Sequence, residues 1–188
     1  FGIVIIMSCI LAFMALKGFE SLIAGQKQMY EKDLMGISYL RQMNRDTNGI
    51  GRAVNRYVLA VGAGDDAGAK SALAGVDGAK KSQQDLFEKS SPTIIRPDVK
   101  AEFEAIKPKM LFYYQLVDKV ISQTKPNDST FAAYKLIASD EYQNAAKDLL
   151  TSIRVLSDKK AEFAEKNLHE AEKAAEDLKQ LIFGIIAG

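Results

Sequence analysis

Cysteine and histidine are nearly absent from this 188-residue chain, which contains one of each, Cys9 and His169. A single thiol excludes an internal disulfide and a metal site built from several thiolates. A lone histidine with no second histidine or cysteine at ligand spacing does not indicate a metal site either. We therefore interpret Cys9 as a small apolar residue of an apolar segment and His169 as a solvated or ion-paired side chain.

The residue sets on which most enzymes depend are also missing. One histidine and one cysteine do not supply the usual nucleophile and base, and acidic pairs such as Glu102 and Glu104 fall on helix surfaces, where carboxylates ordinarily serve solubility. The run beginning at Gly62 is not a phosphate loop, because no strand precedes it and no Gly-Lys-Ser/Thr follows. We expect no catalytic activity and no cofactor.

Excess charge of either sign is absent, since 25 lysines and arginines face 24 aspartates and glutamates. Without a basic field the chain has no general means of attracting nucleic acid, and we expect no nucleic-acid partner. Alternating apolar and polar runs with hairpin turns are likewise absent, so no segment is predicted to be a strand.

Charged residues are missing from both ends of the chain, over residues 1–16 and 181–188. A helix that crosses a bilayer needs about 20 mostly apolar residues, so we expect the first span to begin upstream of Phe1. A signal peptide is the alternative, but it would carry a basic region and a cleavage site. We predict a truncated first transmembrane helix and its exit over residues 1–24, a domain over 25–180, and the start of a second transmembrane helix over 181–188.

Between these ends, four segments show the apolar spacing of amphipathic helices. The first is expected to end at Gly62, and Asp65 or Asp66 then caps a second helix over residues 67–89. Three glycines weaken the helix propensity of that second segment, so packing must stabilise it. The predicted inward positions are Tyr30, Leu34, Ile37, Leu40, Met43, Thr47, Ile50, Val54, Tyr57 and Val61 on the first helix, and Leu73, Val76, Gln83 and Phe87 on the second.

The third segment, which Asp98 is expected to cap, has an apolar heptad, and Pro108 is expected to bend it. The fourth is capped at Ser139-Asp140 and continues into the second apolar end. Their predicted inward positions are Val99, Phe103, Ile106, Met110, Tyr113, Val117 and Val120, and Tyr142, Ala146, Leu149, Ile153, Leu156, Lys160, Phe163, Asn167, Ala171, Ala174, Leu178 and Leu181. Short connections favour antiparallel neighbours, so we predict an all-α, up-down-up-down four-helix bundle whose first and last helices continue into transmembrane helices.

Four local patterns occur in a characteristic order: Tyr30-Glu-Lys-Asp-Leu, Leu40-Arg-Gln-Met-Asn-Arg-Asp-Thr-Asn, Arg56-Tyr-Val-Leu and Tyr142-Gln-Asn-Ala-Ala-Lys-Asp-Leu-Leu. With the two apolar ends, they resemble the four-helix-bundle sensor domain of bacterial methyl-accepting chemotaxis receptors. The resemblance implies a homodimer in the periplasm, anchored in the bacterial inner membrane, which binds small solutes. Its last helix would signal to a cytoplasmic adaptor and kinase.

The same kind of bundle also serves membrane histidine kinases and cyclic-dinucleotide enzymes, and some such modules sense through a periplasmic binding protein. A structural membrane-tethered bundle is a further alternative. The sequence leaves these possibilities open.

The most informative polar feature is a row of four arginines on the first helix, Arg41, Arg45, Arg52 and Arg56. At about 100° per residue they fall within about 60° of arc. An arginine fork matches a carboxylate in two hydrogen bonds, so the row predicts a site for an anion, with di- or tricarboxylates ahead of amino acids. The alternative is a solvated helix face with its charges paired nearby.

Antiparallel packing is expected to bring side chains of the third and fourth helices to this row. Tyr113 is assigned to the core, whereas Tyr114 is expected to turn its hydroxyl toward the ligand. Polar side chains on the seam of the fourth helix, Lys160 and Asn167, either fix the register from inside or extend outward. The predicted ligand-binding residues are Arg45, Asn48, Arg52, Asn55, Arg56, Tyr114 and Thr151.

Overall fold

The computed structural model describes residues 10, 13–14, 16–21, 23–25, 27, 29–126 and 131–187. Within these residues the regular secondary structure is all helical, joined by short connections, and there is no strand. The elements are the π-helix η1 (Met29–Leu34), α2 (Met35–Gly62), α3 (Asp66–Ser90), the 3-10 turn η2 (Ser91–Thr93), α4 (Pro97–Glu104), α5 (Ile106–Gln123), α6 (Ala132–Ile137) and α7 (Asp140–Ala187). The predicted all-α bundle is confirmed.

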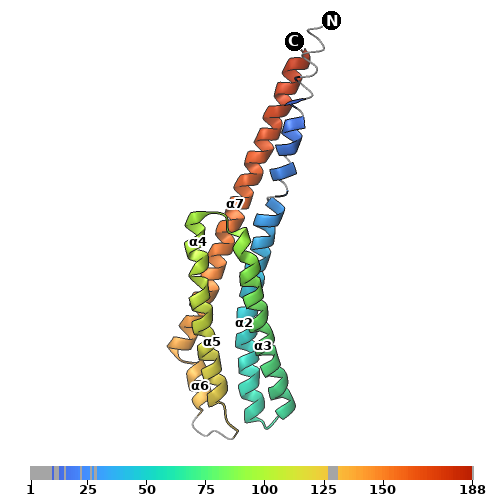
Figure 1. Ribbon diagram of the computed structural model, residues 1–188. Helices are drawn as coiled ribbons and strands as arrows, with labels where there is room; N and C mark the ends of the chain where they lie inside the picture. The colour runs from blue at the N-terminus through green and yellow to red at the C-terminus, as the bar shows by residue number, and fades with distance from the viewer. Residues whose placement is uncertain are drawn as a thin grey trace.

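Four long helical columns lie side by side in an elongated bundle: α2, α3, α4 with α5, and the first part of α7 (Figure 1). The 48 residues of α7 correspond to about 72 Å of helix, and the last part extends beyond the other columns. There α7 runs beside the segment that precedes η1 (Figure 1), and a Cβ added at Gly18 would meet Leu178. The first and last helices therefore leave the bundle together, from one end.

The core follows the predicted seams closely. All seven predicted inward residues of the third column are buried, from Val99 in α4 to Val120 in α5. On α2, the predicted positions Ile37 to Val54 are buried as well. The predictions for Tyr30 and Leu34 were wrong, since both are at least half exposed. They lie in η1, where the wider π-helical turn moves side chains off the face that a 3.6-residue period assigns.

The turn between α2 and α3 has the predicted chemistry. Gly64 has a φ of 71°, which suits a residue without a Cβ. The Asp65 carboxylate caps α3 by accepting a hydrogen bond of 2.9 Å from the backbone N–H of Gly68. The two helices can therefore reverse direction within a few residues.

The predicted disturbance of the third column by Pro108 takes the form of an interruption at Ala105. Pro108 has no N–H to donate to the carbonyl of Glu104, and its ring crowds that carbonyl, so α4 ends at Glu104 and α5 begins at Ile106. Ala105 keeps right-handed helical angles, so the column continues. Asp98 does not cap α4, because Arg96 precedes the helix and Pro97 is its first residue. The Asp98 carboxylate instead accepts two hydrogen bonds from Arg96.

The expected membrane span over residues 1–24 lies largely outside the described residues, as do the side chains at 185–188. Among the residues that the structure does describe, no helix combines the length and apolar character needed to cross a bilayer. On α7, Ala164 is the last buried residue in the described ranges. The predictions of inward positions at Asn167 and Ala174 were wrong, since both are exposed where α7 has no further column to pack against.

Candidate functional site

The four arginines of the predicted row lie on the outward face of α2. Arg41, Arg45, Arg52 and Arg56 are all exposed, whereas Met43, Ile50 and Val54 on the opposite face are completely buried. The row thus has an open side and is not the wall of a closed pocket. We call it the arginine face.

The charges of the arginine face have no counter-charge among the residues that the structure describes. None of the four guanidinium groups makes a hydrogen bond or an ion pair with another residue in the described ranges. The only acid between Arg41 and Gly62 is Asp46. It points toward α3, where its carboxylate accepts a 2.7 Å hydrogen bond from Ser82. The arginine face is therefore solvated, as the alternative expected, but its charges are not paired with acids of the described residues.

The two predicted asparagines flank this face, and both are exposed. Asn48 donates to the carbonyl of Asn44 at 3.0 Å, so its amide is partly engaged by its own helix. Asn44 in turn donates to the carbonyl of Leu150 at 3.2 Å, which fixes the level at which α7 runs beside α2. Asn55 makes no hydrogen bond within the described ranges and is free to meet a ligand.

Thr151 is exposed on α7, one residue after Leu150. The pairing of Leu150 with Asn44 places it at the level of Arg45. Arg52 lies eight residues beyond Asn44, or about 12 Å along the helix axis. The structure therefore brings Thr151 toward the Arg45 end of the face and not toward Arg52 and Arg56. Its neighbour Ser152 accepts a 2.7 Å hydrogen bond from Lys109 of α5.

The expectation that Tyr114 turns its hydroxyl toward a ligand at the arginine face was wrong. Tyr114 is buried, and its hydroxyl donates to the side-chain carbonyl of Gln83 at 2.7 Å, inside the bundle and against α3. Burial raises the pKa of Tyr114, and the Asp46 carboxylate raises it further, so the phenol stays protonated and acts as a donor. The heptad placed Tyr114 beside the apolar seam and near the surface. Its hydrogen bond to the buried Gln83 instead orients the hydroxyl into the bundle.

Tyr114 belongs to a polar cluster in the core that we call the Gln83 network. Gln83 is completely buried, and its amide donates to the backbone carbonyl of Met43 at 3.0 Å and to the Thr47 hydroxyl. The Thr47 hydroxyl donates to the same Met43 carbonyl at 3.0 Å. The sequence offered a signal, because Thr47 and Gln83 both occupy seam positions, but it did not show that they face one another. Gln83 thus accepts from Tyr114 of α5 and donates to Thr47 of α2. Because these hydrogen bonds join three helices inside the core, the network fixes how α2, α3 and α5 pair.

Tyr113 is a core residue, as assigned. Its hydroxyl lies 3.4 Å from that of Tyr142, and the two ring centroids are 5.6 Å apart. Burial raises the pKa of both phenols, so neither supplies a charge to the bundle at neutral pH.

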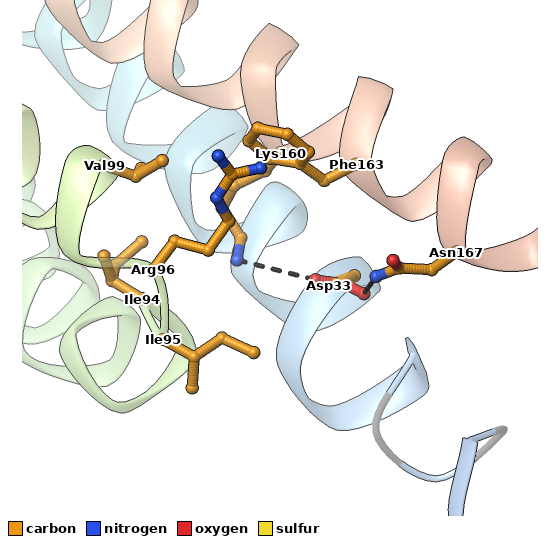
Figure 2. A pocket seen from close by; sticks show the side chains of 8 residues that line it. All are labelled: Asp33, Ile94, Ile95, Arg96, Val99, Lys160, Phe163 and Asn167. Atoms are coloured by element: carbon orange, nitrogen blue, oxygen red, sulfur yellow. Dashed lines mark hydrogen bonds and ion pairs between the residues drawn. The ribbon is translucent and has the colours of Figure 1, made fainter.

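The second polar cluster lies at the end of the bundle from which α7 departs, and it includes Lys160. The side chain of Lys160 points inward, with Nζ donating to the carbonyl of Thr93 at 2.8 Å and lying 3.9 Å from Oδ1 of Asp33 (Figure 2). Both side chains are more than nine-tenths buried. Burial lowers the pKa of Lys160, and the Asp33 carboxylate opposes that shift. Of the two alternatives for this lysine, the interior position is observed.

A pocket of about 220 Å³ adjoins this ion pair, and we call it the Asp33 pocket. Asn167 reaches it from α7 and donates to Oδ2 of Asp33 at 3.4 Å (Figure 2). Gly36 is needed beside it, because a Cβ at that position would overlap Thr93 and Lys160. From the sequence, only Lys160 and Asn167 stood out, as polar residues at seam positions of the fourth helix. The helical periodicity gave no indication that Asp33 would face them.

His169 is exposed on α7 and lies 3.9 Å from a carboxylate oxygen of Glu172. Within the described part of the chain, no three histidine, cysteine, aspartate or glutamate side chains come close enough together to hold a metal ion.

The described residues thus form a helical bundle whose last helix extends beyond the other columns. The profile of the four-helix bundle sensory module for signal transduction matches residues 1–175 of this chain. The chain therefore belongs to this family, which is found in methyl-accepting chemotaxis receptors, and the resemblance drawn from its sequence is confirmed. Comparison with curated proteins and with solved structures gives no match. The family is a sensory and not a catalytic one.

Proposed function

We propose that this chain is the extracytoplasmic ligand-sensing domain of a transmembrane chemoreceptor and that it binds a small organic anion at the arginine face. The observation that supports the proposal is that four exposed guanidinium groups share one helix face without an acidic partner among the described residues. An anion at this face gains charge-assisted hydrogen bonds without displacing an internal ion pair. The membrane spans are proposed at residues 1–24 and 181–188, with the bundle in the periplasm.

An exposed helix face has no walls, so a ligand there needs a second surface to exclude water. We infer that this surface is the α2 helix of a second copy. In a twofold dimer the same patch faces itself, so arginines of both copies would approach one ligand. Repulsion between the two rows favours an occupant with more than one negative charge, which is why di- and tricarboxylates rank ahead of monocarboxylates.

Signal output is proposed to pass through α7, which is continuous from the bundle to Ala187. A ligand that bridges two α2 helices changes how each α2 sits against its own α7, and α7 carries that change toward the membrane. A cytoplasmic adaptor and kinase are proposed to receive the signal.

The proposal is tested by thermal unfolding of the full chain with citrate, succinate, malate and a set of amino acids. We expect a di- or tricarboxylate to raise the melting temperature and Arg52→Ala with Arg56→Ala to abolish the rise. Arg154→Ala is the matched control, because Arg154 is another exposed arginine, on α7, without a partner in the described ranges. If no anion shifts the melting temperature, or if the α2 and α7 variants respond alike, direct anion binding at this face is wrong.

A further inference from the structure

The Asp33 pocket joins the parts of the chain that leave the bundle. Asp33 comes from η1, which leads into α2, and Lys160 and Asn167 come from α7 (Figure 2). The connection between α3 and α4 contributes Ile94, Ile95 and Arg96 to the lining. A molecule in this pocket would therefore touch the first and the last helix at once.

Hydrogen bonding around the buried pair is incomplete. The 3.9 Å between Lys160 Nζ and Asp33 Oδ1 is too long for a hydrogen bond. Lys160 has three donors, and one of them is used, on Thr93. Asp33 receives one long hydrogen bond of 3.4 Å, from Asn167, within the described ranges. Buried charges are ordinarily paired and fully hydrogen-bonded. Among the described residues, no side chain both accepts from Lys160 and donates to Asp33, so both groups keep hydrogen-bonding capacity on the side of the pocket.

The rest of the pocket is apolar and covered by a cation that is already neutralised. Phe163, Val99 and Ile95 line the pocket around the ion pair (Figure 2), and Ile95 is 55% exposed. The Arg96 guanidinium lies 3.5 Å from the centre of the Phe163 ring and pairs with Asp98 at 2.6 Å. Arg96 is balanced by Asp98 and Lys160 by Asp33, so the charged side chains that line the pocket are paired. Lys32 lies outside this lining, donates to the carbonyl of Pro92, and is close enough to lower the pKa of Lys160.

We propose that the Asp33 pocket binds a small molecule without net charge that presents a hydrogen-bond donor next to an acceptor on an apolar body. The donor would lie against Asp33, the acceptor against Lys160, and the body against Phe163 and Val99. Two kinds of molecule have this chemistry: an apolar α-amino acid in its zwitterionic form and a primary amide. A singly charged ligand would leave one member of the buried pair uncompensated, which is costly.

The volume of about 220 Å³ limits the ligand to a small molecule, because drug-sized ligands occupy pockets of about 300 to 1,000 Å³. This site is independent of the arginine face, which lies on the outward side of α2 and selects for negative charge. It adds a second input at the point where both helices leave the bundle.

The experiment is calorimetric titration of the full chain in detergent with four molecules that share one branched apolar body: leucine, isocaproamide, isocaproate and isoamylamine. We expect leucine, isocaproamide or both to bind about tenfold or more tightly than the anion and the amine, because each singly charged analogue satisfies one member of the pair. Binding of leucine would identify the ligand class as apolar α-amino acids, and binding of isocaproamide alone would identify it as primary amides. If neither binds, or if the charged analogues bind as tightly, the proposal is wrong.

Two variants locate the site. Asp33→Asn with Lys160→Gln removes both charges and keeps polar groups of similar size, and Ile95→Trp fills the rim from a position that is 55% exposed. Each is expected to weaken binding about tenfold or more. Lys166→Gln is the control, since Lys166 is exposed further along α7, and it should bind as the wild type does.

If the charge-free variant fails to fold, Ile95→Trp decides the outcome, because its side chain is at the surface. Wild-type affinity in a folded Ile95→Trp protein would exclude this pocket. Titration of the same samples with citrate separates the two sites. Arg52→Ala with Arg56→Ala should remove the anion response and leave the neutral ligand bound, and Ile95→Trp should do the reverse.

Discussion

The bundle contains two buried polar clusters, and they differ in how completely they are satisfied. The Gln83 network is uncharged, and its hydrogen bonds include 2.7 Å from Tyr114 to Gln83 and 3.0 Å from Gln83 to Met43. The Asp33 pocket holds two opposite charges 3.9 Å apart beside a cavity. Both interrupt an apolar seam, but only the first is closed. The completeness of the hydrogen bonds therefore separates the two clusters: the first has a structural role, and the second keeps polar groups at a cavity.

Breaking the charged pair should give the largest effect on stability. Lys160→Met leaves Asp33 buried without its counter-charge, and we expect the free energy of unfolding to fall by about 3 kcal/mol. Adding Asp33→Asn should recover most of that loss. Urea unfolding of both variants measures the difference, and Lys159→Met, at the exposed neighbouring lysine, is the control. An equal cost for the two lysines would mean that the pair is not effectively buried.

The uncharged network should respond next most strongly. Tyr114→Phe deprives the completely buried Gln83 of its 2.7 Å donor, and we expect a loss of about 2 kcal/mol in urea unfolding. Tyr113→Phe is the matched variant one residue away. Its hydroxyl has only a 3.4 Å contact to lose, so its cost should be clearly smaller. Equal costs would contradict the closed network at Gln83.

A smaller effect separates two helical glycines. Gly36→Ala pushes a methyl group into Thr93 and Lys160, and we expect it to destabilise the protein by about 1 kcal/mol. At Gly78 on α3 a Cβ meets nothing within 4 Å, so Gly78→Ala should stabilise by up to about 1 kcal/mol through helix propensity. Thermal unfolding gives both signs in one series. A rise in melting temperature for both variants would show that the Asp33 pocket accommodates an added methyl group on α2.

The smallest effect on stability is expected at the arginine face. Arg52→Ala with Arg56→Ala removes exposed groups without partners in the described ranges, so the urea midpoint without ligand should not move. The same variant is expected to lose its response to a dicarboxylate. A marked fall in the midpoint would indicate that these arginines stabilise the fold and would remove the main support for the anion site.

Much of the fold could be predicted because helical periodicity is a local signal. The seam from Val99 to Val120 and the cap at Asp65 depend on residues within one or two turns, and both are confirmed. The prediction failed where the local period changed. Tyr30 and Leu34 lie in a π-helix, and no pattern in the sequence announced the wider turn.

The candidate site was predicted only in part. The shared outward face of the four arginines follows from their spacing along α2, and the structure has it. The direction of Tyr114 does not follow from spacing, because its hydroxyl is oriented by Gln83 on another helix. The position of Thr151 along the arginine face depends on the register between α2 and α7. That register is seen only in the structure, in the hydrogen bond from Asn44 to the carbonyl of Leu150.

The sequence by itself determined which face of each helix is buried, where the helices turn, and which face carries unbalanced positive charge, because each of these depends on neighbours along one helix. Only the tertiary structure decided that Lys160 points inward, that Asp33 meets it, and that a cavity adjoins them. Asp33 and Asn167 are 134 residues apart in the chain, and no periodic pattern relates them. Periodicity specifies a direction from a helix axis, whereas a partner is specified only when another helix is packed against that side.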